Sequence, residues 1–192
     1  MHFLILGAVF FFAILGFIVL FAAVSTYNGL VGLKNQVDRA WANIDVVLKE
    51  RFDLIPRLIS VCEQYVKYER GTLDHVMQAR SAYGSAVNVD DKIKAATAVG
   101  QTVRGLLALG EAYPNLKSSD QFVEMEKTLR DLEKQIADRR EMYNESVTNF
   151  NTRCQIFPDV FFAQMLGYKT VALYKVEAFE RETPPMKLDL PA

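Results

Sequence analysis

An apolar segment near the N-terminus restricts what the rest of the chain can fold into. Residues 3–24 include no charged residue and no Pro, Asn or Gln. As a helix, these 22 residues span roughly 33 Å, close to the ~30 Å hydrocarbon core of a bilayer. A secretory signal peptide is the competing interpretation, with Ala23, Val24 and Ser25 as its cleavage site. Such a peptide has a positive amino-terminal region and a shorter apolar region, so a retained transmembrane helix at residues 3–24 is predicted.

Charge is confined to the remainder of the chain and is balanced there. The 22 Lys and Arg and the 23 Asp and Glu all lie between Lys34 and Asp189, in no long run of one sign. This balance argues against nucleic acid or a polybasic lipid site as the partner. Lys34 and Arg39 follow the apolar segment, which slightly favours a cytoplasmic location for the bundle. The sequence therefore predicts that the protein contacts the lipid bilayer through residues 3–24.

A regular apolar stripe follows the predicted membrane helix. Its residues recur at steps of three and four, the spacing of one face of an α-helix, and resume in phase after Pro56. Two interpretations of Pro56 stay open: a continuous, kinked helix, or a stop followed by a restart that Asp53 caps. The stripe comprises Leu30, Leu33, Val37, Trp41, Ile44, Leu48, Phe52, Ile55, Ile59, Cys62 and Val66.

A second long helix is predicted from Ser119 to the residue before Pro158. Large apolar residues recur there at every seventh position, which is typical of a long packed helix. Arg139 occupies a position where this seam favours an apolar residue. Its aliphatic stem either packs while its guanidinium reaches water, or the residue forms a buried ion pair with an acid of the first helix. The heptad residues are Phe122, Leu129, Ile136, Tyr143, Phe150 and Phe157.

The segment between these helices predicts two shorter ones. Residues 69–86 form the first, and residues 92–113 form the second after a turn at Asn88. The second contains Gly100, Gly105 and Gly110, which indicate either close helix packing or a partly unwound segment. Cys62 and Cys154 form no CxxC pair and fall at apolar helical positions, so both are interpreted as buried small hydrophobic residues.

Two stretches with a shared spelling form the candidate contact surface. Residues 27–35 and 143–151 each run Tyr-Asn, six residues, Asn. In an up-and-down bundle the two stretches lie level with each other and close to the bilayer, where Tyr side chains are favoured. A solvated face is the simpler interpretation, and a polar contact between helices or with a partner is the alternative. The residues concerned are Tyr27, Asn28, Asn35, Tyr143, Asn144 and Asn151.

The order of residues across these helices resembles the LemA family of bacterial membrane proteins. The resemblance is carried by AW-x-x-IDV-x-LK-x-R-x-DLIP at residues 40–56 and by LLAL-G-EAYP-N-LKS at residues 106–118. It is carried also by ME-x-x-L-x-x-LE-x-x-I-x-x-RR-x-x-YN-x-x-V-x-x-FN at residues 125–151. It covers residues 27–167 and implies a membrane-anchored helical bundle in the bacterial inner membrane. It implies no defined biochemical activity.

No motif for a cofactor, metal or nucleotide is visible. The two histidines form no metal-binding pair, and GxGxxG, GxxxxGK[ST] and GxSxG are absent. We therefore expect a protein that is not an enzyme and that binds no cofactor, metal or small-molecule substrate.

The predicted fold is all-α: one N-terminal transmembrane helix followed by an elongated, mostly antiparallel bundle of about four helices. The expected organisation is a membrane helix at 3–24, a bundle at 27–167 and an irregular tail at 168–192, where residues 168–176 either form a docking segment or are disordered. The preferred function is a non-enzymatic scaffold or adaptor for self-assembly or partner binding. The alternatives are an oligomeric membrane-shaping or membrane-organising protein and an auxiliary subunit of a membrane protease or transporter. The expected partner is a second copy or another membrane protein.

Overall fold

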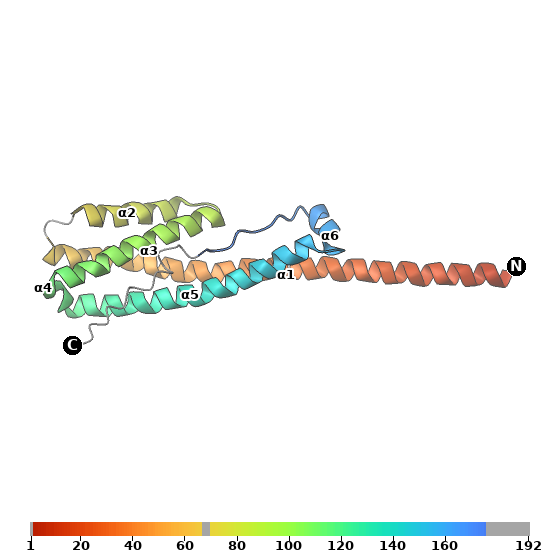
Figure 1. Cartoon of the computed structure of the whole chain (residues 1–192), viewed down its shortest axis with the longest axis horizontal. Helices are drawn as coiled ribbons and strands as arrows, with labels where there is room; N and C mark the ends of the chain where they lie inside the picture. Colours follow the sequence, from red (N-terminus) through yellow and green to blue (C-terminus); the bar gives the residue numbers. More distant parts are fainter. Residues whose placement is uncertain (1, 67–69, 176–192) are drawn as a thin grey trace, which may run out of the picture. The chain divides into compact units, whose positions relative to one another are not determined.

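A computed structural model describes residues 2–66 and 70–175, and this part of the chain contains six helices and no strand. The predicted all-α class is confirmed. In chain order the helices are α1 (His2–Tyr65), α2 (Arg70–Ser85), α3 (Val89–Ala112), α4 (Pro114–Lys117), α5 (Asp120–Gln155) and α6 (Asp159–Met165), as drawn in Figure 1.

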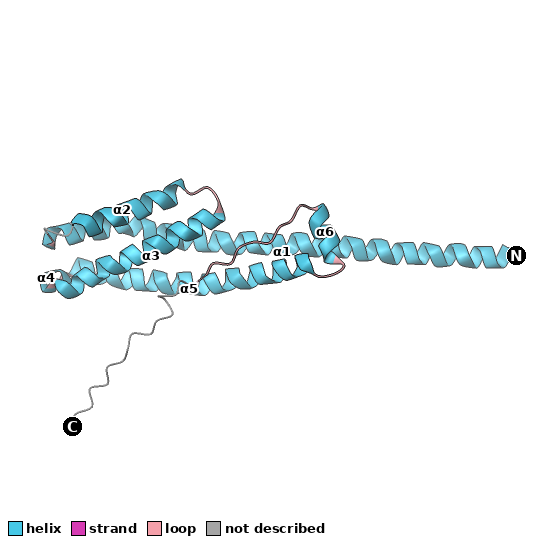
Figure 2. Ribbon diagram, turned by 45° about the horizontal axis from the view of Figure 1, so that its top comes forward, coloured by secondary structure: helices cyan, strands magenta, loops and turns pink. Residues whose placement is uncertain are grey.

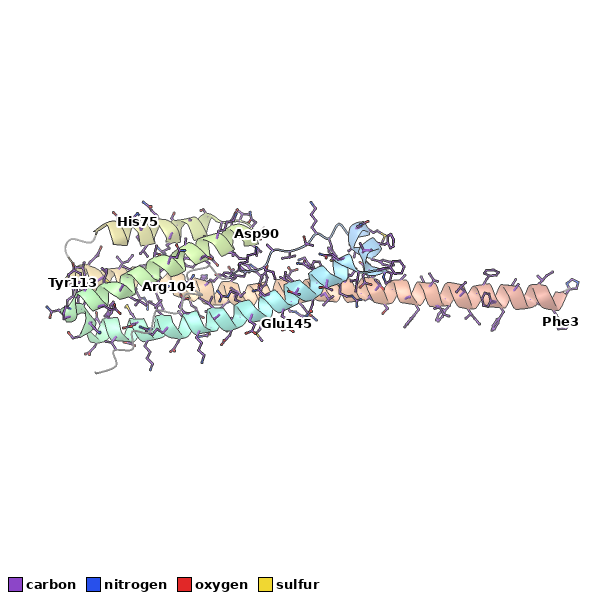
Figure 3. The ribbon with its side chains drawn as sticks, viewed as in Figure 1. Phe3, His75, Asp90, Arg104, Tyr113 and Glu145 are labelled. Atoms are coloured by element: carbon purple, nitrogen blue, oxygen red, sulfur yellow. The ribbon has the colours of Figure 1, made fainter. Side chains whose placement is uncertain are left out.

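Helix α1 is one uninterrupted helix of 64 residues that includes both the apolar segment and the stripe that follows it. Pro56 lies inside this helix, so the continuous alternative is confirmed. The apolar segment supplies one candidate membrane span, and none of the residues in its most hydrophobic stretch is buried. Phe3, labelled in Figure 3, is 92% exposed. Burial begins at Leu30, where the stripe residues turn inward.

The chain forms two compact units, and α1 and α5 each contribute to both. Unit 1 consists of Met1–Val46 and Ala137–Leu173, and unit 2 consists of Val47–Ile136 and Tyr174–Ala192. Residues 168–175 adopt neither helix nor strand, and the part of the expected tail at 176–192 lies outside the described residues.

Unit 1 is built on an antiparallel pair formed by the N-terminal part of α1 and the C-terminal part of α5. The ring of Trp41 on α1 meets that of Tyr143 on α5 edge to face, with 5.7 Å between centroids. Further along, Gly29 lies next to Arg153: a Cβ at Gly29 would be 3.5 Å from the Arg153 Nη2 atom. Residue numbers therefore rise along α1 where they fall along α5, as in an antiparallel pair.

Unit 2 packs the end of α1 and the start of α5 with α2, α3 and α4. Helices α2 and α3 run side by side in opposite directions (Figure 2). The Asn88 side chain caps α3 by accepting a 2.8 Å hydrogen bond from the Asp91 N–H, because the first amides of a helix have no partner within it. Tyr83 of α2 also stacks on Phe52 of α1, with centroids 4.0 Å apart.

The heptad seam of α5 is confirmed at five of its six positions. Phe122, Leu129, Ile136, Tyr143 and Phe150 are each at most 4% exposed. The expectation for Phe157 is wrong, since this residue is 79% exposed. Helix α5 ends at Gln155, and the chain turns before Pro158, so helical spacing no longer determines which way Phe157 points.

Two of the three glycines of α3, Gly100 and Gly110, serve close packing, whereas Gly105 is exposed. Gly110 is buried against α5, and a Cβ there would lie 2.6 Å from Cε1 of the fully buried Phe122 ring. A Cβ at Gly100 would lie 3.4 Å from the Arg51 guanidinium. The alternative of an unwound segment is wrong, because α3 is helical throughout these positions.

We predict that Gly110→Ala lowers the stability of the protein although alanine is the better helix former. The added methyl group must displace a buried ring, which costs about 1–3 kcal/mol. Gly84→Ala on α2 is the matched control, because nothing lies within 4 Å of its added Cβ. That control should gain about 0.4–1 kcal/mol. Thermal unfolding followed by circular dichroism should show midpoints that move in opposite directions, and an unchanged or raised midpoint for Gly110→Ala would contradict the packing described.

Candidate functional site

The six residues of the predicted contact surface all lie in unit 1, and the structure divides them by exposure. Tyr27, Asn28 and Asn35 are exposed on α1. Tyr143 is 1% exposed and belongs to the core, whereas Asn144 and Asn151 are half-buried on α5. The Gly29–Arg153 and Trp41–Tyr143 contacts bring the two stretches side by side.

Two of these residues hold a later segment of the same chain. The Asn151 side chain donates from Nδ2 to the Val171 carbonyl and accepts at Oδ1 from the Val171 N–H, each at 2.9 Å. The carbonyl of the next residue, Ala172, accepts a 3.2 Å hydrogen bond from the Tyr143 hydroxyl. An amide that pairs with both main-chain groups of one residue acts as the neighbouring strand would in a sheet.

The held segment starts with a turn that glycine permits. Helix α6 is followed by Gly167, whose φ of +68° is the left-handed conformation that ends many helices. The Tyr168 ring then packs edge to face on Phe150, with centroids 5.5 Å apart. Residues 168–172 are thus fixed by one aromatic contact and three polar contacts with α5, and this docking segment was one of the two interpretations of the sequence.

Arg139, the residue singled out for a buried ion pair, lies half-buried in unit 1. Its Nη1 atom donates to the main-chain carbonyl of Asn43 at 3.1 Å, which ties α5 to α1. The guanidinium therefore hydrogen-bonds to a backbone oxygen of the first helix.

An ion pair with a buried guanidinium lies in unit 2, at Arg51, a residue that sequence reasoning missed. Arg51 is 2% exposed; Nη1 donates to Glu133 Oε1 at 2.7 Å, and Nη2 donates to the Ala96 carbonyl at 2.6 Å. One side chain thus links α1, α5 and α3. A signal was present, since Arg51 lies three residues after Leu48 and four before Ile55, on the apolar stripe itself.

The two cysteines are buried and lie outside the candidate span. Burial raises the pKa of the Cys62 thiol to about 11, and the neighbouring Glu63 carboxylate adds to the effect. Burial, and then the charge of Asp159, also raises the pKa of Cys154. Since the thiolate is the nucleophile, both groups are poorly reactive at neutral pH.

A half-open groove of about 310 Å³ lies among α3, α4 and α5 within unit 2. Its charged lining residues are of both signs, and Arg130 is paired with Glu126 at 2.5 Å. The remaining charges are those of Arg104, Lys117 and Glu111. This mixture gives no clear preference for an anion or a cation. In the described residues, no group of three or more His, Cys, Asp or Glu side chains is placed to hold a metal ion.

The fold and these contacts define a class: a helical bundle whose first helix also supplies a candidate membrane span. The sequence pattern of the LemA family matches residues 40–188, and the chain belongs to this family. It is similar to Protein LemA of Metamycoplasma hominis, with 28% identity over 165 residues that cover 84% of this chain and 74% of that protein.

The chain is also similar to magnetosome proteins. It is 23% identical over 174 residues to MamQ of Magnetospirillum gryphiswaldense, covering 77% of this chain and 64% of MamQ. MamQ 2 of Paramagnetospirillum magneticum is 22% identical over 175 residues, with 78% and 64% covered. The chain therefore spans less than two thirds of the length of these MamQ relatives.

We predict that Glu133→Ala destabilises the protein by about 1–3 kcal/mol, since the buried Arg51 guanidinium loses its carboxylate. The lower part of this range is expected because the Glu133 side chain is 41% exposed and water can partly replace it. Glu126→Ala, seven residues earlier on α5, removes a pair in which Arg130 is 69% exposed, and should change stability by less than about 1 kcal/mol. Equal shifts of the denaturation midpoint for the two variants would contradict the importance of Arg51.

We also predict that Asn151→Leu releases the segment that follows α6. Leucine matches asparagine in size but leaves the Val171 N–H and carbonyl without partners. The loss of two hydrogen bonds, at about 1 kcal/mol each, should make the segment detach from α5 roughly tenfold or more often. Trypsin cleavage after the exposed Lys169, followed by mass spectrometry, measures this opening. Asn35→Leu is the control on the exposed face of α1, and equal cleavage rates for the two variants would contradict the role of Asn151.

Proposed function

We propose that this protein is a non-enzymatic scaffold that is anchored in a membrane and presents its helical bundle for self-assembly. The observation that carries the proposal is the continuity of α1, in which the candidate span and the bundle stripe share one helix. A partner that binds the bundle is thereby held near the bilayer. The resemblance to LemA supports the bacterial inner membrane as this membrane, and Lys34 and Arg39, which follow the apolar segment, slightly favour a cytoplasmic bundle.

The use of buried charge supports a structural rather than a catalytic protein. Arg51 joins three helices, and the buried Asp159 forms an ion pair with Arg153. Catalytic groups are usually held at a cavity, whereas these charged groups make contacts between helices. The polar side chains of the interior thus serve to join helical segments.

Exposed apolar residues on the bundle favour self-assembly. In unit 1, Val46 of α1 is 56% exposed and Met142 of α5 is 65% exposed. Glu145, three residues from Met142, projects outward in Figure 3. Apolar surface of this kind is often covered when protein molecules associate.

Membrane organisation is the second candidate function, and two findings favour it. Two of the relatives described above are named as magnetosome proteins. The turn and short helix that follow α5 also expose apolar side chains next to the candidate span. An oligomer of such bundles would impose its own spacing on the lipids beneath it.

The test is the mass of the full-length protein in mild detergent, measured by light scattering with the detergent contribution subtracted. We expect a defined multiple of 21.8 kDa. Val46→Glu combined with Met142→Glu should lower this mass, because charge on both exposed positions opposes association. Val87→Glu, at a position that is 94% exposed, is the control and should leave the mass unchanged. A monomeric wild-type protein, confirmed by cross-linking in native membranes, would contradict self-assembly.

A further inference from the structure

The turn after α5 and helix α6 carry an apolar surface that no described part of the chain covers. Phe157, Phe161 and Met165 are 79%, 63% and 72% exposed. Within α6, Phe161 and Met165 are four residues apart and so share a face of the helix. The rings of Phe157 and Phe161 also meet edge to face, with centroids 5.9 Å apart. These three residues form one continuous surface, here named the apolar foot.

The foot is held firmly on unit 1 by contacts on its other side. Asp159, in the first turn of α6, is 3% exposed and pairs with Arg153 of α5. Ala163 lies between the two foot residues of α6 in sequence and is 2% exposed. The direction in which the foot points is therefore set by a buried ion pair and a buried methyl group.

The position of the foot along α1 is set by Arg153. Arg153 lies beside Gly29, five residues beyond the candidate span, where an added Cβ would be 3.5 Å from its Nη2 atom. At 1.5 Å per residue this separation is about 7.5 Å. Because α5 runs antiparallel to α1, the chain after Arg153 continues toward the span, and Figures 1 and 2 both show α6 beside α1 where α5 ends. Tyr27, which is 42% exposed, lies on α1 in the same short interval.

We propose that the apolar foot inserts into the interfacial layer of the same bilayer that α1 crosses. This inference rests on the proposed anchoring of α1. The occupant follows from the position, since a surface within about 10 Å of a membrane-spanning segment meets lipid headgroups and the outer ends of acyl chains. Aromatic side chains are favoured at this depth, and the 42%-exposed Tyr27 fits the same layer.

Two points of attachment have a consequence that one helix alone does not have. A single membrane helix can rotate about its axis and tilt freely, whereas a foot beside it fixes which side of α1 faces the lipid surface. Helix α5 then has a defined orientation to the membrane, and so do the exposed residues of unit 1. The foot thus acts as an interfacial anchor that orients the unit.

The experiment introduces one additional cysteine at a time into the full-length protein and attaches a nitroxide label to it. The labelled protein is placed in phosphatidylethanolamine–phosphatidylglycerol vesicles. Collision with oxygen reports lipid, and collision with a water-soluble nickel complex reports water. Phe161→Cys tests the foot and Phe12→Cys tests the anchor. Ala137→Cys is the matched control: it replaces an exposed residue of the same unit, 18 residues before the end of α5 and thus about 27 Å along the helix. The wild-type protein, with two buried cysteines, is the blank.

The proposal predicts that oxygen dominates at residues 12 and 161 and that the nickel complex dominates at residue 137. Lipid contact at residue 12 with water contact at residue 161 would overturn the foot and leave the anchor intact. Water contact at residue 12 would overturn the anchor, and the foot with it. A label at residue 161 that neither reagent reaches would also overturn lipid insertion, and would identify a second copy of the chain as the occupant.

Discussion

The hydrogen-bonded continuity of α1 is the constraint on which the other elements depend. A helix that leaves a bilayer has no water-exposed break at the boundary unless its sequence introduces one, and residues 25–30 contain neither Pro nor a charge. The helix therefore continues to Tyr65 and supplies the inner face of both compact units. Even Pro56, which removes one main-chain hydrogen bond, does not end it, because buried apolar residues on both sides hold the helix in place.

Polar side chains then join other segments to the long helices by binding main-chain groups. Arg139 reaches a carbonyl of α1, Arg51 reaches a carbonyl of α3, and Asn151 binds both main-chain groups of Val171. Main-chain N–H and C=O groups are present whatever side chain the residue carries, proline excepted for the N–H. Such contacts fix the course of the chain without demanding a particular residue at the position that is bound.

Sequence periodicity predicted the long helices because it records burial directly. The apolar stripe of α1 and the heptads of α5 up to Phe150 face the core as their spacing requires. The prediction was wrong at Phe157, where α5 has already ended and side-chain spacing carries no information about direction. For the glycines of α3 the sequence left two interpretations open, and the ring of Phe122 beside Gly110 shows why close packing is the correct one at that position.

The candidate site was predictable in its residues but not in its partners. The repeated Tyr-Asn spelling identified Tyr143 and Asn151, yet their partners are main-chain atoms about 20–30 residues later, beyond the reach of local spacing. Arg51 was missed for a different reason: a charged residue on an apolar stripe is seldom fully buried, and only the three-dimensional proximity of Glu133 and Ala96 makes that burial tolerable.

The central claim is that the candidate span and the first helix of the bundle are one unbroken helix. Amide hydrogen exchange of the full-length protein in lipid nanodiscs tests it most directly, at residues 25–35. The structure predicts slow exchange throughout this segment, comparable with that of residues 37–48, because every amide there is bonded within α1. A group of fast-exchanging amides at residues 25–29, with slow exchange on both sides, would show a break at the membrane boundary and contradict the account.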